Sequence, residues 1–234
     1  MKNSRAIFHE RSDLPMKFSI PCTIPYGSAD HAQKVCECLD ALYPEPACAL
    51  HFQSPLELLI AVILSAQCTD ARVNIVTQSL FQKYRTASDY ANVSQEELER
   101  DIHSTGFYRN KAKNIRECCR ILAEKFNGEV PVSMEELVQL PGVGRKTANC
   151  VLGTFFGIAE GVVVDTHVLR LSQRLGLSDE TTPEKVEQDL IRIVPRDRWV
   201  KISHQLILFG RNVCTARNPK CAECPFNTEA ETAF

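Results

Sequence analysis

The chain has 234 residues, of which 44% are hydrophobic and 24% are charged, a composition typical of globular proteins with one or two domains. These values exclude a chain that is disordered throughout and a collagen-like fibre. The longest mainly apolar run, residues 58–66, is too short to span a membrane, which takes about 20 residues. The N-terminal residues lack an apolar segment of signal-peptide length, so we expect a cytoplasmic protein. The formal net charge of −2 excludes a uniformly basic chain, but it permits a local basic surface.

Residues 1–27 contain scattered polar residues and three prolines, and we expect a flexible extension there. From residue 28 onward the patterns predict helices. Serine or threonine in front of an acidic or apolar segment is typical of a helix start, and we expect helices to begin at Ser28 or Asp30, Ser54, Thr69, Ser94 and Ser133. A longer helix is predicted before Gly128, because apolar residues recur there at steps of four and three.

The C-terminal half is also predicted to be helical. We expect helices from Arg145 to about Gly157, after a cap at Asp165, from Thr182, and over residues 199–213, where apolar side chains recur at helical spacing. Residues 162–164 form the only β-branched run, which is too short and solitary to make a sheet. The sequence therefore predicts an all-α protein.

Eleven cysteines are a high number for a chain of this length. Eight of them precede residue 151, they are scattered, and several lie in helical apolar patterns. We interpret most of them as reduced thiols that act as small core residues. Cys214, Cys221 and Cys224 differ from the rest, because they are clustered near the C-terminus.

The segment LPGVG at residues 140–144 leaves only a tight turn between two helices. Gly142 and Gly144 lack Cβ atoms, so the backbone can approach a phosphate closely. The N–H groups that begin the next helix favour an anion. Arg145 and Lys146 place two cations in that first turn, where they oppose the helix dipole unless a phosphate binds. The pattern favours phosphate binding over a turn that serves helix packing alone.

Five segments, in the same order, resemble the endonuclease III family of helix-hairpin-helix DNA glycosylases. They are LLIAVILSAQCTD, TGFYRNKAKNI, LPGVGRKTAN, VVDTHVLRLSQRLG and the C-terminal cysteine run, and the resemblance covers about residues 30–225. It implies a two-lobed all-α fold, with a six-helix bundle at residues 48–158 and a second lobe at 28–47 and 159–234. It also implies a monomeric, nucleoid-associated enzyme of base excision repair, which excises oxidised pyrimidines from double-stranded DNA and then cleaves the strand at the abasic site.

Lys146 matches the nucleophile of the family. A neutral amine can attack the sugar carbon that bears the damaged base, and the resulting Schiff base makes loss of the 3′ phosphate feasible. The other interpretation of Lys146 is a solvated lysine that contacts phosphate. Asp165 matches the essential carboxylate, which would stabilise the developing sugar cation or assist proton transfer. Because Asp165 opens a helix, it also suits an N-cap, and both roles are compatible.

A base inside a duplex must be flipped out before its sugar can be attacked, and a side chain fills the gap. Gln67 matches the family residue that enters the vacated space, and Phe107 is the candidate wedge in a second loop. The alternative for Phe107 is ordinary core packing. Basic side chains concentrate at residues 105–125 and 192–220, and we expect these stretches to mark one DNA-facing side.

The resemblance implies a [4Fe–4S] cluster and no catalytic metal, but the ligand pattern is incomplete. The family spacing is C-x6-C-x2-C-x5-C, and this chain supplies Cys214, Cys221 and Cys224, while Ala230 stands at the fourth position. A [4Fe–4S] cluster normally takes four thiolates. The candidates for a fourth donor are Cys22, Cys36, Cys38 and Cys48, and the other interpretation is a decayed site without a cluster.

Two further functions remain open from the sequence. An adenine-mismatch glycosylase resembles this chain but lacks the nucleophilic lysine, so Lys146 argues against it. A non-catalytic helix-hairpin-helix DNA-binding protein is favoured by the missing cysteine, and it is opposed by the presence of Lys146, Asp165 and Gln67.

Overall fold

The computed structural model describes residues 24–226. Most of the extension expected at residues 1–27 lies outside the described residues, as do Cys22 and Ala230. Helices account for all the regular structure between residues 24 and 226, so the all-α fold class is confirmed. No helix in this part of the chain is long and apolar enough to cross a membrane.

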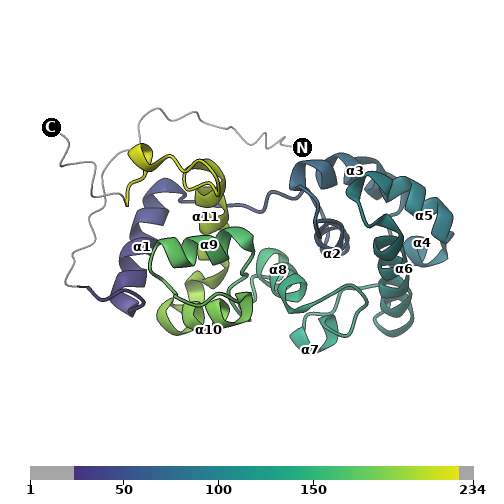
Figure 1. The fold of residues 1–234 in the computed structure, drawn as a ribbon. Coiled ribbons are helices and arrows are strands. Elements are labelled where there is room, and N and C mark those ends of the chain that lie inside the picture. The colour runs from purple at the N-terminus through teal and green to yellow at the C-terminus, as the bar shows by residue number, and fades with distance from the viewer. Residues whose placement is uncertain (1–23, 227–234) are drawn as a thin grey trace. The chain divides into compact units, whose positions relative to one another are not determined.

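The helices follow one another through short connections (Figure 1). The α-helices are α1 (Ala29–Leu42), α2 (Pro55–Leu64), α3 (Asp70–Lys83), α4 (Ala87–Asn92), α5 (Gln95–Ile102), α6 (Tyr108–Lys125), α7 (Met134–Leu137), α8 (Arg145–Phe156), α9 (Thr166–Arg174), α10 (Pro183–Ile193) and α11 (Trp199–Asn212). Short 3-10 helices are η1 (His103–Thr105), η2 (Arg196–Arg198) and η3 (Cys221–Glu223).

Side-chain caps fix the helix starts that the sequence predicts. In each case the capping oxygen accepts a hydrogen bond from the backbone N–H three residues later, at Ser28, Ser54, Thr69, Ser94 and Ser133. All five starts are therefore confirmed, with Ser28 as the cap of α1. The sequence patterns do not predict α4, which has only six residues, although Thr86 and Asp89 form a complete capping box at its start.

The chain divides into two compact units. The hairpin unit comprises residues 46–164 and 194–204; the terminal unit comprises, within the described range, residues 24–45, 165–193 and 205–226. These bounds differ from those of the expected lobes, because residues 46–47, 159–164 and 194–204 belong to the hairpin unit. Arg196 donates from Nη2 to the Ala159 carbonyl at 3.0 Å, and the Val163 N–H donates to Ser203 Oγ at 3.0 Å.

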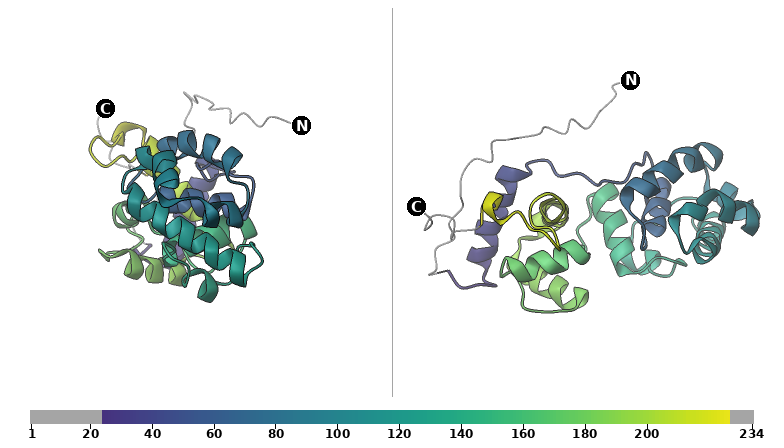
Figure 2. Two further views of the ribbon diagram at one scale, coloured as in Figure 1. Left: turned by 90° about the vertical axis from the view of Figure 1, so that its right-hand side faces the viewer. Right: turned by 45° about the horizontal axis from the view of Figure 1, so that its top comes forward.

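Helix α2 forms the centre of the hairpin unit. Leu58, Leu59 and Ile60 are consecutive and fully buried, a pattern typical of a helix that is packed on every side. Helices α3, α6 and α8 contact it and surround it in Figure 1, and Figure 2 shows the same unit from two further sides. Helices α4 and α5 pack against α6. This core supports the start of α8 and the loops that follow α2 and η1.

The terminal unit is assembled from separate parts of the chain. It contains α1, α9, α10 and residues 205–212 of α11. Gln205 Nε2 donates to Asp40 Oδ1 and to the Tyr43 carbonyl oxygen, both at 3.0 Å, which ties α11 to the end of α1. The Gly27 N–H donates to the Gly176 carbonyl at 2.8 Å, which ties the segment before α1 to the end of α9. Long-range hydrogen bonds therefore hold this unit together.

Candidate active site and nucleic-acid interface

The predicted hairpin is present between α7 and α8. The Val143 N–H donates to the Leu140 carbonyl at 3.0 Å, which closes the turn, and both side chains are buried. Gly142 has a φ of +79°, a left-handed conformation that favours glycine. A Cβ at Gly142 would also lie 2.9 Å from the Cβ of Asn114. Internal geometry therefore requires Gly142, independently of any phosphate.

Gly144 has a different environment. It is the N-cap of α8, with an extended backbone (φ −88°, ψ 174°), and no side chain caps the first turn of this helix. A Cβ on Gly144 would meet nothing within 4 Å. Gly144, Arg145 and Lys146 are all exposed, so the first turn of α8 lies at an open surface. Helix starts of this kind attract anions.

Lys146 occupies this exposed first turn. One turn further along α8 lies Cys150; burial raises the pKa of its thiol, and the positive charge of Lys146 opposes the rise. The neighbouring Arg145 donates to the carbonyl oxygen of Glu160 at 3.4 Å. The exposure of Lys146 is compatible with attack on a substrate and with a phosphate contact, and both interpretations stay predictions.

Asp165 is the N-cap of α9, as one of its two interpretations predicts. Its Oδ1 accepts hydrogen bonds from the His167 and Val168 N–H groups, both at 2.8 Å. These bonds fix the carboxylate at the helix start and leave Oδ2 without a hydrogen bond to any described residue. Lys146 belongs to the hairpin unit and Asp165 to the terminal unit, and the catalytic role of the carboxylate stays a prediction.

Gln67 and Phe107 share an unusual backbone. Their φ values are +53° and +47°, and only Asn127 among the other non-glycine residues of the described range has a positive φ. The left-handed region is unfavourable for such residues by about 1 kcal/mol or more. Phe107 is 63% exposed, so core packing is the wrong interpretation of this side chain. Two exposed side chains on constrained loops are compatible with insertion into DNA.

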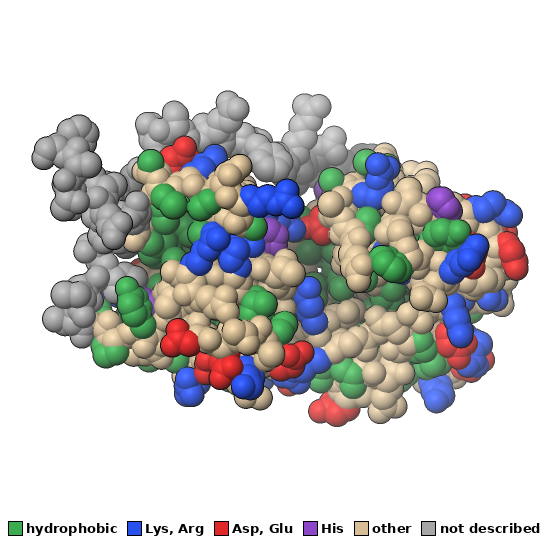
Figure 3. Space-filling model, in the orientation of Figure 1, with side chains coloured by type: hydrophobic (Ala, Val, Ile, Leu, Met, Phe, Trp, Pro, Cys, Tyr) green, Lys and Arg blue, Asp and Glu red, His purple; other side chains and the backbone are tan. Residues whose placement is uncertain are grey.

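The basic stretch at residues 105–125 is only partly available to DNA. Lys111 is 5% exposed, so the expectation that this stretch faces DNA is wrong for Lys111. Arg120 forms ion pairs with Glu117 and Glu124 on its own helix, at 2.5 Å and 2.6 Å. Acidic and basic side chains are mixed on the face shown in Figure 3. Arg109 remains exposed, with its guanidinium over the Tyr108 ring.

Sequence patterns contained a signal for the burial of Lys111. Positions 111, 115, 118 and 122 follow one another at helical spacing, and the last three carry Ile115, Cys118 and Leu122, which are fully buried. Lys111 therefore continues the apolar stripe of α6. Its charge concealed this periodicity, because a lysine in a basic stretch is ordinarily placed on the surface.

The cysteines divide into two groups. No disulfide links any of the cysteines within the described residues, and Cys36, Cys38, Cys118 and Cys119 are buried, as expected of core thiols. Cys214 and Cys224 are half-buried, and Cys221 is exposed at the start of η3. No group of three or more Cys, His, Asp or Glu side chains converges on a metal-sized site between residues 24 and 226. The described donors therefore do not fit a complete four-thiolate cluster.

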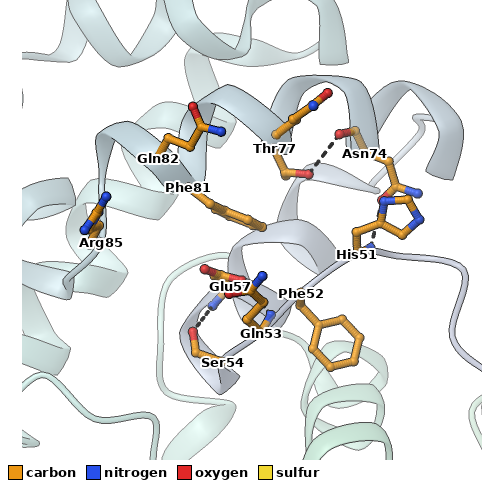
Figure 4. Close-up of a pocket in the computed structure, with 11 residues that line it drawn as sticks. His51, Phe52, Gln53, Ser54, Glu57, Asn74, Thr77, Phe81, Gln82 and Arg85 are labelled. Atoms are coloured by element: carbon orange, nitrogen blue, oxygen red, sulfur yellow. Dashed lines mark hydrogen bonds between the residues drawn. The ribbon is translucent and has the colours of Figure 1, made fainter. Parts of the chain in front are cut away.

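A surface hollow of about 960 Å³ lies in the hairpin unit between residues 51–57 and helix α3 (Figure 4). Its polar side chains serve local structure. The His51 N–H donates to Asn74 Oδ1 at 2.9 Å, and the Gln53 N–H donates to Glu57 Oε2 at 2.6 Å. None of the predicted site residues lines the hollow. It provides no support for a second active site.

Comparison with known proteins identifies two matching families. The model of HhH-GPD superfamily base excision DNA repair proteins matches residues 60–196, and that of the iron-sulfur binding domain of endonuclease III matches residues 214–228. Endonuclease III of Synechocystis sp. is 56% identical over 186 residues, which cover 80% of this chain and 85% of that protein. Endonuclease III of Bacillus subtilis is 51% identical over 192 residues, covering 80% and 87%.

Solved structures of similar fold agree with these matches. A trapped covalent endonuclease III–DNA intermediate has a TM-score of 0.81 and 48% identity, covering 85% of this chain and 93% of that one. A non-covalent endonuclease III–DNA complex has a TM-score of 0.81 and 49% identity, covering 85% and 92%. The superfamily match spans more than half of the chain and contains Gln67, Phe107, Lys146 and Asp165. The chain therefore belongs to the endonuclease III family, within the HhH-GPD superfamily of base excision DNA repair proteins.

Proposed function

We propose that this chain is a bifunctional DNA glycosylase and abasic-site lyase, which acts on oxidised pyrimidines in double-stranded DNA during base excision repair. The observation that carries the proposal is Lys146, an exposed amine on the first turn of the hairpin helix α8. Membership of the endonuclease III family supports it. So does the similarity to a covalent endonuclease III–DNA intermediate, since covalent attachment requires a nucleophile.

In this mechanism the neutral Nζ of Lys146 attacks C1′ of the damaged nucleotide. The C1′–Nζ bond forms as the glycosidic C1′–N bond breaks, and the electron pair of the broken bond leaves with the base, which takes up a proton. Loss of a proton from Nζ and opening of the sugar ring give a Schiff base. Its electron withdrawal acidifies C2′, so a base removes a C2′ proton, a C2′–C3′ double bond forms, and the C3′–O bond breaks as the 3′ phosphate leaves with its electron pair.

Asp165 supports this reaction through its second carboxylate oxygen. Because the start of α9 holds Oδ1, the carboxylate has a fixed orientation while Oδ2 stays available. A negative charge there stabilises the positive charge that develops on the sugar, or it accepts a proton during ring opening. Gln67 and Phe107 fill the space that the extruded nucleotide leaves.

Borohydride trapping tests the proposal. Wild-type protein is incubated with a duplex that contains thymine glycol, and borohydride reduces the Schiff base to a stable protein–DNA adduct. We expect an adduct with the wild type and with Lys185→Gln, which removes an exposed lysine of α10, and none with Lys146→Gln. DNA binding without any wild-type adduct would favour the non-catalytic alternative, and excision without an adduct would favour a monofunctional glycosylase.

DNA affinity in this proposal depends on phosphate contacts at the hairpin and at Arg109. We expect binding to weaken steeply as the salt concentration rises, because each contact releases counterions from DNA. Arg109→Gln and Arg145→Gln should each make the logarithmic salt slope shallower by about one unit. An unchanged salt slope would show that the substituted arginine makes no phosphate contact. We further propose that the protein works as a monomer on the DNA of the cytoplasmic nucleoid.

For the C-terminal loop, we propose that Cys214, Cys221 and Cys224, which do not converge on a metal site in the described structure, come together around an iron–sulfur cluster that lacks the local fourth thiolate at position 230. The family match at residues 214–228 supports an iron–sulfur site, and the missing thiolate makes it labile. Anaerobically purified protein should be brown, contain iron and bleach in air, and Ala230→Cys should prevent the bleaching. Iron-free protein with full activity would show instead that the three thiols are remnants.

A further inference from the structure

Lys111 is the only buried Lys, Arg, Asp or Glu residue in the described part of the chain. Its ammonium donates to two backbone carbonyl oxygens, of Leu64 and of Thr105, both at 2.8 Å. An ammonium is tolerated in the interior only with partners of this kind, because burial penalises an unpaired charge. Burial lowers the pKa of Lys111 accordingly. The position of this lysine therefore depends on the two carbonyls.

Both carbonyls stand at the end of a helix. Leu64 is the last residue of α2, and Thr105 is the last residue of η1. The last carbonyls of a helix lack partners within the helix, and the helix dipole favours a cation beside them. A single ammonium thus caps two helices that lie far apart in the sequence.

The loops that begin at these two helix ends carry the two left-handed residues. Gln67 lies three residues after Leu64, and Phe107 lies two residues after Thr105. A left-handed backbone at such residues persists only where the surrounding structure holds it. The backbone N–H of Lys111 also donates to the Phe107 carbonyl at 3.1 Å. Lys111 therefore contacts the base of both loops and the last residue of the second one, Phe107.

We propose that Lys111 is a positioning residue, which fixes the Gln67 loop relative to the Phe107 loop so that both side chains enter the DNA together when a nucleotide is extruded. This inference rests on the proposed function, in which these two side chains fill the gap. A displacement of about 1 Å at a positioning group can lower a rate by about 100-fold. A lysine that served phosphate binding would be exposed, and one that served packing alone would not need two carbonyls at the loop bases.

The test compares Lys111→Met with Lys113→Met in the full chain. Methionine resembles lysine in length and in its apolar stem, but it donates no hydrogen bond. Lys113 is exposed on the same helix, so its variant controls for the loss of one positive charge. Two substrates are used: a duplex with thymine glycol opposite 2-aminopurine requires extrusion, and a single-stranded oligonucleotide with an abasic site does not.

Excision from the duplex should be at least about tenfold slower with Lys111→Met than with Lys113→Met, because the gap is no longer filled by both loops. The rise in 2-aminopurine fluorescence that reports unstacking should be lost as well. Cleavage of the single-stranded substrate should differ by less than about twofold, because the chemistry is intact. Lys111→Arg, which retains a cation with N–H donors, should excise faster than Lys111→Met.

Equal excision from the duplex by the two methionine variants would overturn the proposal, and so would an equal loss on both substrates, which indicates a general structural defect. Amide hydrogen exchange without DNA gives a measurement independent of activity. Exchange at residues 65–69 and 103–107 should be faster in Lys111→Met alone, and unchanged exchange would overturn the tie between the loops. Wild-type protein that excises nothing would contradict the proposed function, while the exchange result would still decide the role of Lys111.

Discussion

Two loop systems of this protein are held by cations that donate to backbone carbonyls, and they are built differently. In the hairpin unit one buried ammonium, that of Lys111, serves the ends of both α2 and η1. In the terminal unit two guanidinium groups share the carbonyls of residues 210–216: Arg170 donates to Gly210 and Cys214, and Arg174 donates to Thr215 and Ala216. A single buried donor fixes the two helix ends relative to each other, so its removal affects both. Where two partly exposed donors share the carbonyls of a loop, one donor still holds the loop after the other is removed.

Removal of the Lys111 ammonium should have the largest effect on stability. Lys111→Met leaves two buried carbonyl oxygens without their donor, and we expect the free energy of unfolding to fall by about 2–4 kcal/mol. Urea denaturation measures this value. Lys113→Met is the control, with an expected change below about 0.5 kcal/mol. Similar values for the two variants would show that water or local movement satisfies both carbonyls, and the contrast with the guanidinium groups would disappear.

The two glycines of the hairpin extend the comparison to a backbone constraint. Gly142→Ala combines a left-handed φ with a Cβ only 2.9 Å from Asn114, so we expect the free energy of unfolding to fall by about 1–3 kcal/mol. Gly144→Ala has an extended backbone and open space, so its stability should change by less than about 0.5 kcal/mol. The DNA affinity of Gly144→Ala should fall, because the added methyl group would separate the backbone from a phosphate. Fluorescence anisotropy measures the DNA affinity, and urea denaturation measures the free energy of unfolding. Equal destabilisation by the two alanine variants would contradict the prediction.

His31 supplies a pH-dependent test within the terminal unit. It is fully buried, neither ring nitrogen has a hydrogen-bond partner among the described residues, and burial lowers its pKa from the ordinary 6.5. The unfolded chain takes up a proton below about pH 6.5 and the folded chain resists it, so stability is lost as the pH falls, by at most about 1.4 kcal/mol per unit.

His31→Phe should therefore lose about 1 kcal/mol less stability than the wild type between about pH 7 and 5.5, as measured by urea denaturation across that range. Exposed His51→Phe is the control. If the pH profile of His31→Phe equals that of the wild type, the stability that is lost in acid comes instead from His167 and His204, whose pKa values are also lowered by burial.

Arg174→Gln should have the smallest effect. Arg170 keeps its bonds to Gly210 and Cys214, so we expect the free energy of unfolding to fall by less than about 1 kcal/mol. Hydrogen exchange should nevertheless become faster at residues 214–216. A loss as large as that in Lys111→Met would show that the C-terminal loop also depends on a single donor.

Local signals in the sequence predict much of the fold, because a capping side chain and its N–H partner lie three residues apart. The starts of α1, α2 and α3 follow from Ser28, Ser54 and Thr69 in this way. The exposure of Phe107 does not follow, since it depends on left-handed backbone at the start of α6, which no periodicity encodes. The burial of Lys111 also escapes prediction, because its two acceptors belong to other helices.

In the candidate site, too, some features follow from local sequence signals and others depend on distant parts of the chain. Lys146 and the hairpin glycines lie in one short motif, so the sequence brings them together directly. Asp165 is predicted as an N-cap from its neighbours alone, and the structure confirms that cap. Its partnership with Lys146 depends on the arrangement of two units and is supported by the family resemblance rather than by any local pattern.

The hydrogen bonds from Gln205 to Asp40 and Tyr43 imply an order of events during synthesis. The ribosome makes α1 long before it makes Gln205, and at about 5–20 residues per second the delay is roughly 8–30 s. Residues 46–164 are continuous in the chain, so the core around α2 can form within that interval. During this interval α1, with Val35 and Leu39 on its apolar face, has not yet packed against α11. The nascent chain can therefore form the core around α2 while the apolar face of α1 stays without its α11 partner until residue 205 has been synthesised.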